Sequence, residues 1–266
     1  MSKPTVKALF FDIDGTLLGY STHQINPRDL ESLERLKEKG YLLFIATGRD
    51  LTTINESRAI KQAEPIMTGF ISANGQQCWL ADGTEISFHP LSPEDLIPVR
   101  TCCEEHHIAM LYSIAGITYV TEMTDHVKGF AKHVGMNVPE VRPLDPDMRD
   151  IAKLCVYASP SDQKKYLDPI IRHSWTARNC EHLIDLIPEG IGKDSGIREV
   201  CAHFGIDPAQ TMAFGDGAND IPMLKAAGIG VAMRIAQDKV KESADYVTGS
   251  SEEAGITQAL EHFGLL

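Results

Sequence analysis

The segment FFDIDGTLL at residues 10–18 constrains the fold more than any other part of the sequence. It continues an apolar run over residues 6–11, which predicts a buried strand, and then presents the carboxylates Asp12 and Asp14. Gly15 follows, and glycine permits backbone angles that other residues resist. Because two carboxylates at the end of an apolar strand repel each other, we expect a cation or another compensating group beside them.

Strands and helices alternate at both ends of the chain. The N-terminal pattern predicts strands over residues 6–11, 41–47 and 69–75, a helix that starts at Asn26-Pro27 and ends at Gly40, and another from Asp50. The C-terminal pattern predicts a helix over 194–204 and strands over 211–216, 229–233 and 245–248, again with helices between them. This alternation indicates an α/β fold in which both ends build one doubly wound, mainly parallel, Rossmann-like sheet.

The pattern changes between these two regions. Short strands such as TEISFH, AMLYS, ITYVTE, KLCVYAS and HLIDLI alternate with helices that start near Pro93, Asp125 and Asp162. We therefore expect an inserted α+β cap domain over residues 84–187, and a catalytic core formed by 1–83 and 188–266.

Composition narrows the possible partners and surroundings. The formal net charge is −12 and there is no basic run, which argues against binding a nucleic acid polymer. No apolar run reaches the roughly 18 residues of a membrane helix, and the first residues do not resemble a signal peptide, so we expect a cytoplasmic protein without membrane contact. The six cysteines include no CxxC pair and indicate reduced core thiols. A monomer or weak homodimer is expected.

Four polar segments follow predicted strands: DIDGT at 12–16, TGR at 47–49, SANG at 72–75 and GDGAND at 215–220. Ligands of open parallel sheets bind at the carboxyl ends of the strands, so we expect Asp12, Asp14, Asp216 and Asp220 to share one crevice. Two charges about 4 Å apart repel by roughly 4 kcal/mol at an effective dielectric constant near 20, and a divalent cation removes this conflict. Hard oxygen ligands without Cys or His favour Mg²⁺.

The same segments supply the groups that phosphoryl transfer needs. A carboxylate can attack phosphorus and split hydrolysis into two easier steps, while its neighbour acts as acid and base. Thr47 and Gly48 offer a hydroxyl and an accessible amide, and Lys193 offers a positive charge for the phosphate. Asn74 either satisfies a turn or contacts the substrate.

The ordered set DxDGT, TGR, GK and GDxxND resembles the haloacid dehalogenase-like (HAD) superfamily. Within it, the chain resembles the Cof-type phosphatases of subclass IIB, which carry a large α/β cap between the second and third motifs. IPEGIGK (187–193), GDGANDIPML (215–224) and GIGVAM (228–233) extend the resemblance over the whole chain.

The resemblance implies a role for each acidic residue. Asp12 would be the nucleophile and a metal ligand. Asp14 would be the general acid and base, and its backbone carbonyl would also bind the metal. Asp216 would bind the metal directly. Asp220 would support the metal through water or orient Lys193.

The resemblance also implies the phosphate site and the activity. Thr47, Gly48 and Lys193 would hold the phosphate, and Asn219 would contact phosphate or substrate. The implied activity is Mg²⁺-dependent hydrolysis of a small phosphorylated metabolite, such as a sugar phosphate, nucleotide or cofactor phosphate, through an aspartyl-phosphate. A sugar phosphomutase is the alternative. A phosphorylatable switch protein is a further alternative, against which Asp14 and the large cap argue. No spacing in the cap indicates the substrate.

Overall fold

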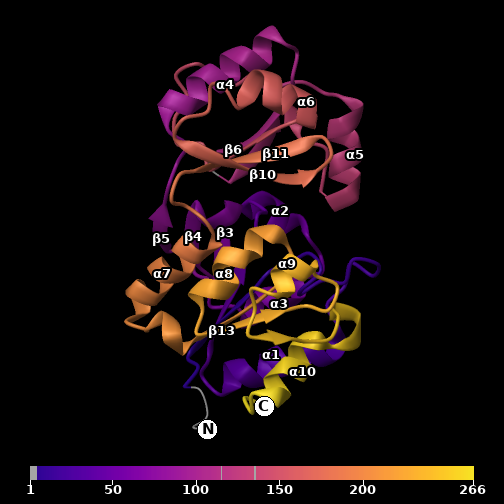
Figure 1. Ribbon diagram of the computed structural model, residues 1–266, viewed down its shortest axis with the longest axis vertical. Coiled ribbons are helices and arrows are strands. Elements are labelled where there is room, and N and C mark those ends of the chain that lie inside the picture. The colour runs from indigo at the N-terminus through magenta and orange to yellow at the C-terminus, as the bar shows by residue number, and fades with distance from the viewer. Residues whose placement is uncertain (1–4, 115, 135) are drawn as a thin grey trace. The chain divides into compact units, whose positions relative to one another are not determined.

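The computed structural model describes residues 5–114, 116–134 and 136–266, and these form two compact units (Figure 1). Unit 1 consists of the described residues of Met1–Gly48, Arg58–Ser87 and Gly192–Leu266. Unit 2 consists of those of Arg49–Ser57 and Phe88–Ile191. Both ends of the chain therefore build unit 1, and the central part of the chain builds most of unit 2.

Unit 1 contains an eight-stranded sheet of order β14-β13-β12-β1-β2-β3-β4-β5. Its parallel strands are β1 (Ala8–Phe11), β2 (Leu42–Ala46), β3 (Gly69–Ser72), β12 (Thr211–Gly215), β13 (Ile229–Ala232) and β14 (Tyr246–Val247). The α/β fold class is confirmed. The sequence pattern did not indicate β4 (Gln77–Leu80), which runs antiparallel to β3, and it assigned the next strand to the cap. In the structure that strand, β5 (Glu85–Phe88), is the outer strand of the unit 1 sheet.

The helices of unit 1 lie between these strands in the sequence or follow the last of them. They are α1 (Pro27–Glu38), α3 (Ile60–Ala63), α7 (Lys193–Phe204), α8 (Ile221–Ala226), α9 (Asp238–Lys241) and α10 (Gly255–His262), with short 3-10 turns η1 (Glu64–Ile66), η2 (Ala73–Gly75), η4 (Pro208–Gln210), η5 (Ala218–Asp220) and η6 (Ser251–Glu253). The side chain of Asn26 caps α1 by accepting from the backbone N–H of Arg28, and Pro27 occupies the first turn. This is the start that the Asn-Pro pair predicts.

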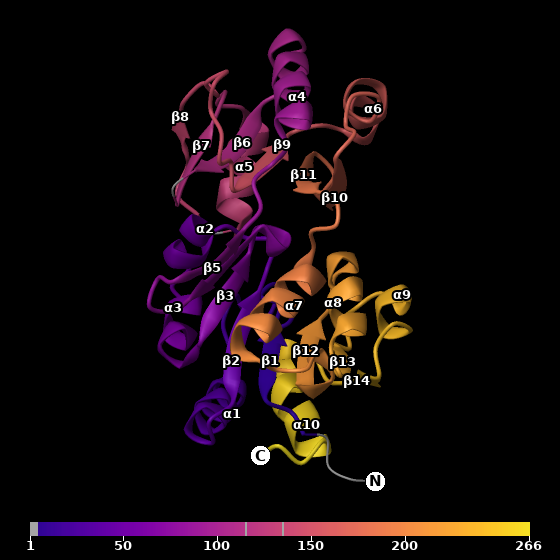
Figure 2. The same cartoon turned by 90° about the vertical axis from the view of Figure 1, so that its left-hand side faces the viewer.

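The core of unit 1 fixes the central strands. Phe10 of β1 stacks on Phe44 of β2 with ring centroids 5.3 Å apart, and both side chains are buried. Helices α7 and α8 cover this face of the sheet through buried residues that include Ile197 and Leu224 (Figure 2). Because β1 and β12 lie in the middle of the sheet, the residues that follow them start from a rigid platform.

A buried carboxylate joins α1 to α10. Oδ1 of Asp29 accepts hydrogen bonds from the backbone N–H and the hydroxyl of Thr257, at 2.8 and 2.7 Å. Burial raises the pKa of Asp29 to about 6, although the hydrogen bonds from Thr257 act in the opposite direction. Aspartates of an unfolded chain have a pKa of about 3.9. The folded protein therefore holds a proton on Asp29 more tightly than the unfolded chain does.

We expect Asp29→Asn to remove part of the pH dependence of stability. In the wild type, protonation of Asp29 contributes on the order of 2 kcal/mol at low pH, and this contribution is lost as the pH rises through about 6. The unfolding temperature of the wild type minus that of the variant should therefore fall as the pH rises from about 3.5 to 6.5 and stay level above that range. Thermal unfolding in chelator measures this difference, and parallel pH curves would contradict it.

Unit 2 contains a six-stranded sheet of order β10-β11-β9-β6-β7-β8. The strands are β6 (Met110–Ile114), β7 (Ile117–Val120), β8 (Glu140–Val141), β9 (Lys153–Val156), β10 (Ser174–Cys180) and β11 (Leu183–Pro188). The helices in the segment Phe88–Ile191 are α4 (Pro93–Glu105), α5 (Asp125–Val134), α6 (Pro160–Asp162) and the π-helical turn η3 (Gln163–Leu167). Leu96 and Val99 of α4 pack on Tyr112 and Leu154 of the sheet. The sequence pattern predicted most of these elements but missed β8 and β10.

Helix α2 (Leu51–Glu56) belongs to unit 2, although it lies between two strands of the unit 1 sheet in the sequence. Asp50 caps it by accepting from the N–H of Thr53 at 2.8 Å, and its other oxygen accepts from the hydroxyl of Thr118 in β7 at 2.7 Å. At the far end, Glu56 accepts from the N–H and the side chain of Asn137. The chain therefore passes from unit 1 to unit 2 directly after Gly48.

Two further observations concern the chain as a whole. Among the described residues, no helix combines the length and apolar character needed to cross a membrane. The cysteines Cys78, Cys102, Cys103, Cys155, Cys180 and Cys201 are free thiols, as expected. The expectation that all are core residues is wrong for Cys180, which is exposed, and for Cys102, which is half-buried.

Candidate active site

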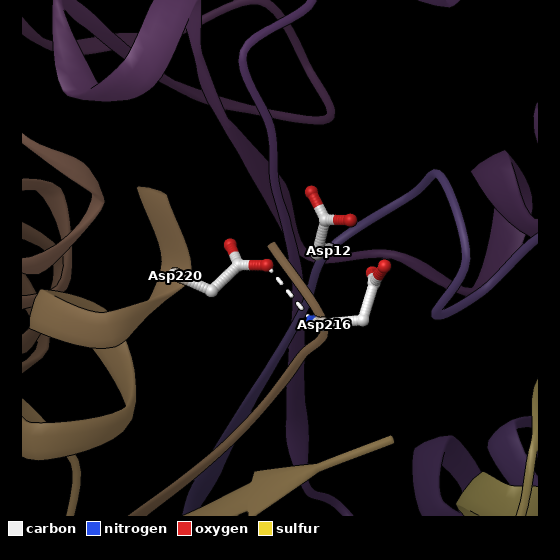
Figure 3. A group of neighbouring side chains, drawn as sticks. All are labelled: Asp12, Asp216 and Asp220. Atoms are coloured by element: carbon white, nitrogen blue, oxygen red, sulfur yellow. Dashed lines mark hydrogen bonds between the residues drawn. The ribbon is translucent and has the colours of Figure 1, made fainter. Parts of the chain in front are cut away.

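Asp12 and Asp216 leave adjacent strands at the same edge of the unit 1 sheet. β1 and β12 are parallel with Phe11 beside Phe214, and the backbone N–H of Asp12 donates to the carbonyl of Phe214 at 3.0 Å. Each aspartate directly follows the last residue of its strand, so parallel pairing brings the two side chains together. Asp220 ends the turn η5 that comes next, and Figure 3 shows its side chain facing the same space.

The carboxylate oxygens of Asp12, Asp216 and Asp220 come within 4.8 Å of one another, and all three residues are buried. Lys193 joins two of them, because its Nζ lies 2.5 Å from Oδ1 of Asp12 and 2.6 Å from Oδ1 of Asp220. Lys193 is itself only 1% exposed, so these ion pairs form away from water. Three carboxylates and one ammonium thus share one small polar space.

Asp14 occupies a different position from the other acids. It is half-buried, and among the described residues its side chain is not part of the three-carboxylate group. Its backbone instead forms a bridge with Leu18 in the turn after β1. The roles expected of the Asp14 carbonyl group at the metal and of its carboxyl group in proton transfer therefore stay predictions.

The electrostatics of the site follow from burial and crowding. Burial raises the pKa of Asp12 well above its usual range, Lys193 lowers it, and the neighbouring carboxylates raise it further. Burial and the charge of Asp220 raise the pKa of Asp216 to about 6. Burial alone would lower the pKa of Lys193, but Asp12 and Asp220 raise it well above the ordinary value. Lys193 therefore stays charged, and the protein alone compensates the carboxylates only in part.

Asp220 also organises the backbone beneath the group. Its Oδ2 accepts from the N–H of Asp216 at 3.0 Å and from that of Gly217 at 2.9 Å, and the first contact is the dashed line in Figure 3. A Cβ at Gly215 would lie 2.5 Å from the Cβ of Asp220, so this close packing needs glycine. Asp220 thus holds both Lys193 and the loop that carries Asp216.

The groups expected to hold phosphate also belong to unit 1. Thr47 follows β2, is 2% exposed, and donates its backbone N–H to the carbonyl of Ile71 at 2.8 Å. Gly48 comes next, Lys193 begins α7, and Asn219 is half-buried within η5. The structure therefore puts all of the residues expected at the site on the segments that follow β1, β2 and β12 or at the start of α7.

Two contacts to Asp216 were not foreseen from the sequence. The hydroxyl of Thr16 donates to Oδ1 at 2.9 Å, and the hydroxyl of Tyr20 donates to Oδ2 at 3.0 Å. Gly15 permits this approach, because its φ is +88° and a Cβ there would lie 2.5 Å from Oδ2 of Asp216. The DGT motif already contains Thr16 and could have suggested its role, whereas nothing in the local pattern singles out Tyr20.

The donor set fits a hard divalent cation. All three converging side chains offer carboxylate oxygens, which Mg²⁺ and Ca²⁺ prefer to nitrogen or sulfur ligands. When the three carboxylates are ionised, the single positive charge of Lys193 leaves the group with a net negative charge. This excess of negative charge contributes to the raised pKa values of Asp12 and Asp216. The cluster can also orient one carboxylate toward an electrophile, since Lys193 fixes Oδ1 of Asp12.

Comparison with known proteins identifies relatives that match nearly the whole chain. The sequence profile of haloacid dehalogenase-like hydrolases matches residues 9–260. A putative phosphatase of Bacillus subtilis, YkrA, is 30% identical over 98% of both chains, and the pyridoxal phosphate phosphatase YbhA of Escherichia coli is 28% identical over 96% of this chain and 97% of its own. The solved structure of the HAD subclass IIB sugar phosphatase BT4131 has a TM-score of 0.89 and 34% identity, and covers 98% of this chain and 100% of its own.

The profile match extends over nearly the whole chain, YkrA is similar to the chain in sequence, and BT4131 is similar in both sequence and fold. The converging carboxylates with Lys193 lie on the segments that carry the DxDGT, GK and GDxxND motifs. The chain therefore belongs to the haloacid dehalogenase-like hydrolases of the Cof type, and it is a phosphatase of that family.

Proposed function

We propose that this phosphatase uses Mg²⁺ to hydrolyse the phosphate ester of a small metabolite through a phosphorylated Asp12. The observation that carries the proposal is the buried group of Asp12, Asp216 and Asp220 around the ammonium of Lys193. In this group a carboxylate oxygen lies beside a fixed positive charge, which supports nucleophilic attack on a bound phosphate. The group also concentrates more negative charge than one lysine neutralises, which favours uptake of a cation.

The proposed roles of the residues are those that the family resemblance implies, and the positions of Asp12 and Lys193 support them. Asp12 attacks phosphorus, the ester bond to the leaving oxygen breaks, and Asp14 gives that oxygen a proton. Water then attacks the aspartyl-phosphate while Asp14 takes up a proton, which releases phosphate and restores Asp12. Lys193, Thr47, Gly48 and Asn219 bind the phosphate oxygens and stabilise the charge that develops on them.

The metal would be held by the carboxylates of Asp12 and Asp216 and by the backbone carbonyl of Asp14, with Asp220 supporting the site from behind. When bound, the ion supplies charge that draws the phosphate toward Asp12 and stabilises the transferring group. Thr16 and Tyr20 would orient Asp216 for this purpose through their hydrogen bonds.

The proposed substrate class is small phosphorylated metabolites. The relatives include a phosphatase named for pyridoxal phosphate and a sugar phosphatase. The substrates that these names indicate are both phosphate monoesters, and they differ in the group that carries the phosphate. We propose that the substrate of this chain belongs to the same class of small phosphate monoesters.

A substrate panel tests the proposal. Sugar phosphates, nucleotides and cofactor phosphates are incubated with the protein in Mg²⁺ or in excess chelator, and free phosphate is measured. We expect phosphate release from at least one ester, reduced by roughly a hundredfold or more in chelator because a bound cation supplies several kcal/mol of stabilisation. Release that is insensitive to chelator would contradict the metal role. Isomerised sugar phosphate without free phosphate would show a mutase instead.

A further inference from the structure

The turn after β3 has an unusual backbone. Ala73, Asn74 and Gly75 have consecutive positive φ values of 49°, 55° and 93°. Asparagine and glycine tolerate this region, but alanine adopts it rarely and at a cost in free energy. Ala73 and Asn74 are also almost fully buried, at 1% and 2% exposed. The surrounding packing therefore holds this turn in a conformation that the chain alone does not favour.

The turn touches the segments that carry Thr47 and Lys193. The backbone N–H of Asn74 donates to the carbonyl of Thr47 at 2.9 Å. A Cβ at Gly75 would lie 2.1 Å from the carbonyl oxygen of Gly192, the residue immediately before Lys193. Only glycine permits this approach, so the start of α7 packs directly on the turn.

The side chain of Asn74 reaches a further segment of the site. The Nδ2 of Asn219 donates to Oδ1 of Asn74 at 3.1 Å. On its other side the carboxamide of Asn74 lies against Gly48, where a Cβ would be 3.1 Å from both Oδ1 and Nδ2. Asn74 thus stands between the loop after β2 and the turn η5, the two segments that carry the proposed phosphate contacts Gly48 and Asn219.

The hydrogen bond has a direct consequence for Asn219. Its side chain is half-buried, and without a fixed partner its amide can rotate. An amide NH₂ has two N–H donors, so the bond to Asn74 uses one and directs the second in a fixed direction. Holding a donor in place before the ligand arrives is what makes it effective toward a phosphate oxygen.

We infer that Asn74 is a positioning residue, which orients the amide of Asn219 toward the phosphate. This inference rests on the proposed function, because it assigns Asn74 to the phosphate site of that reaction. The competing explanation is that asparagine stands here only because it tolerates a positive φ. The two explanations predict different results for Asn74→Gly, because glycine tolerates the same backbone conformation but lacks the side chain.

A double-mutant cycle separates them. Asn74→Gly, Asn219→Ala and the double variant are compared with the wild type in their affinity for inorganic phosphate and orthovanadate, and in kcat and KM for an aryl phosphate, at saturating Mg²⁺. We expect Asn74→Gly to weaken phosphate and vanadate binding by roughly tenfold, the scale of one hydrogen bond to a charged group. The double variant should bind within about twofold of Asn219→Ala alone, because Asn74 acts through Asn219.

Ala254→Gly is the matched control. Ala254 is buried in unit 1 with a φ of 58° at the start of α10, so it reports the effect of glycine at a positive φ away from the phosphate contacts. This control should bind phosphate like the wild type. Unfolding temperatures show whether each variant retains its fold, which glycine at position 74 should preserve.

Two results would overturn the inference. Folded Asn74→Gly with wild-type affinity for phosphate and vanadate would leave Asn74 as a turn residue only. Independent, additive losses in the double variant would show that Asn74 does not act through Asn219. Failure of the proposed function is distinguishable from both, because it would appear in the wild type as absence of phosphate binding and ester hydrolysis.

Discussion

Asp12→Asn should lower kcat for an aryl phosphate by roughly four orders of magnitude or more, because the amide cannot form the covalent intermediate. The substitution keeps the size of the side chain and an oxygen that can accept from Lys193. Folding should not suffer. Burial and the neighbouring carboxylates raise the pKa of Asp12, so its charged form is disfavoured in the folded protein and a neutral side chain relieves that conflict.

Two measurements check this expectation. Steady-state turnover gives the loss of activity, and thermal unfolding in chelator should place the variant at or above the wild type. Asp29→Asn is a matched control, since it makes the same chemical change at a buried aspartate of unit 1 that lies between α1 and α10, and it should retain turnover. A folded Asp12→Asn protein with substantial turnover would remove Asp12 from the role of nucleophile.

Lys193→Met should reduce both activity and stability. Methionine has a similar length but no charge, so Asp12 and Asp220 would lose the ammonium that lies 2.5 and 2.6 Å away. Removing one partner from a buried ion pair costs roughly 3–5 kcal/mol, and losing a charge that stabilises the transferring phosphoryl group costs roughly 10²–10³ in turnover. The loss of stability should be larger in chelator than in Mg²⁺, because a bound cation restores part of the missing charge.

The control for this prediction is Lys39→Met. Lys39 also belongs to unit 1, but it is exposed and donates to the carbonyl of Leu265 at 2.9 Å. Its removal should change the unfolding temperature little and turnover not at all. Unfolding temperatures in chelator and in Mg²⁺ together with turnover of an aryl phosphate provide the readout. Wild-type stability of Lys193→Met in chelator would contradict the view that Lys193 compensates the carboxylates.

The sequence predicted the arrangement of the site well where it depends on strand order. Apolar runs mark β1, β2 and β12, and parallel strands that end in polar motifs must bring those motifs to one edge. Asp12 and Asp216 therefore meet although they lie 204 positions apart in the sequence. Lys193 was harder to place from local pattern, but the GK pair before a helix and the family resemblance both pointed to it.

Assignment of segments to units was less predictable. The run TEISFH alternates apolar and polar residues as a strand does, but this pattern does not indicate which sheet the strand joins. In the structure the strand is β5, which extends the sheet of unit 1. Helix α2 follows a core strand in the sequence, yet Asp50 and Glu56 bond to residues of unit 2. Both assignments depend on pairing between distant residues, which periodicity within a short window does not contain.

The contacts that tune the site were also beyond local pattern. Tyr20 lies in a turn whose neighbours suggest only that the chain reverses. For Asn74 the sequence suggested a turn or a substrate contact, but not its bond to Asn219. Their hydrogen bonds reach Asp216 and Asn219, whose positions depend on the folded sheet. Motifs identify the reacting groups, while the residues that orient those groups come from segments without a fixed spacing to them.

A crystal structure with Mg²⁺ and a phosphate analogue is the most direct test of the central claim. We predict one ion with carboxylate oxygens of both Asp12 and Asp216 at about 2.1 Å, the analogue beside Asp12, and the ammonium of Lys193 on an oxygen of the analogue. An ion that binds elsewhere, or an analogue that does not contact Asp12 and Lys193, would contradict the account.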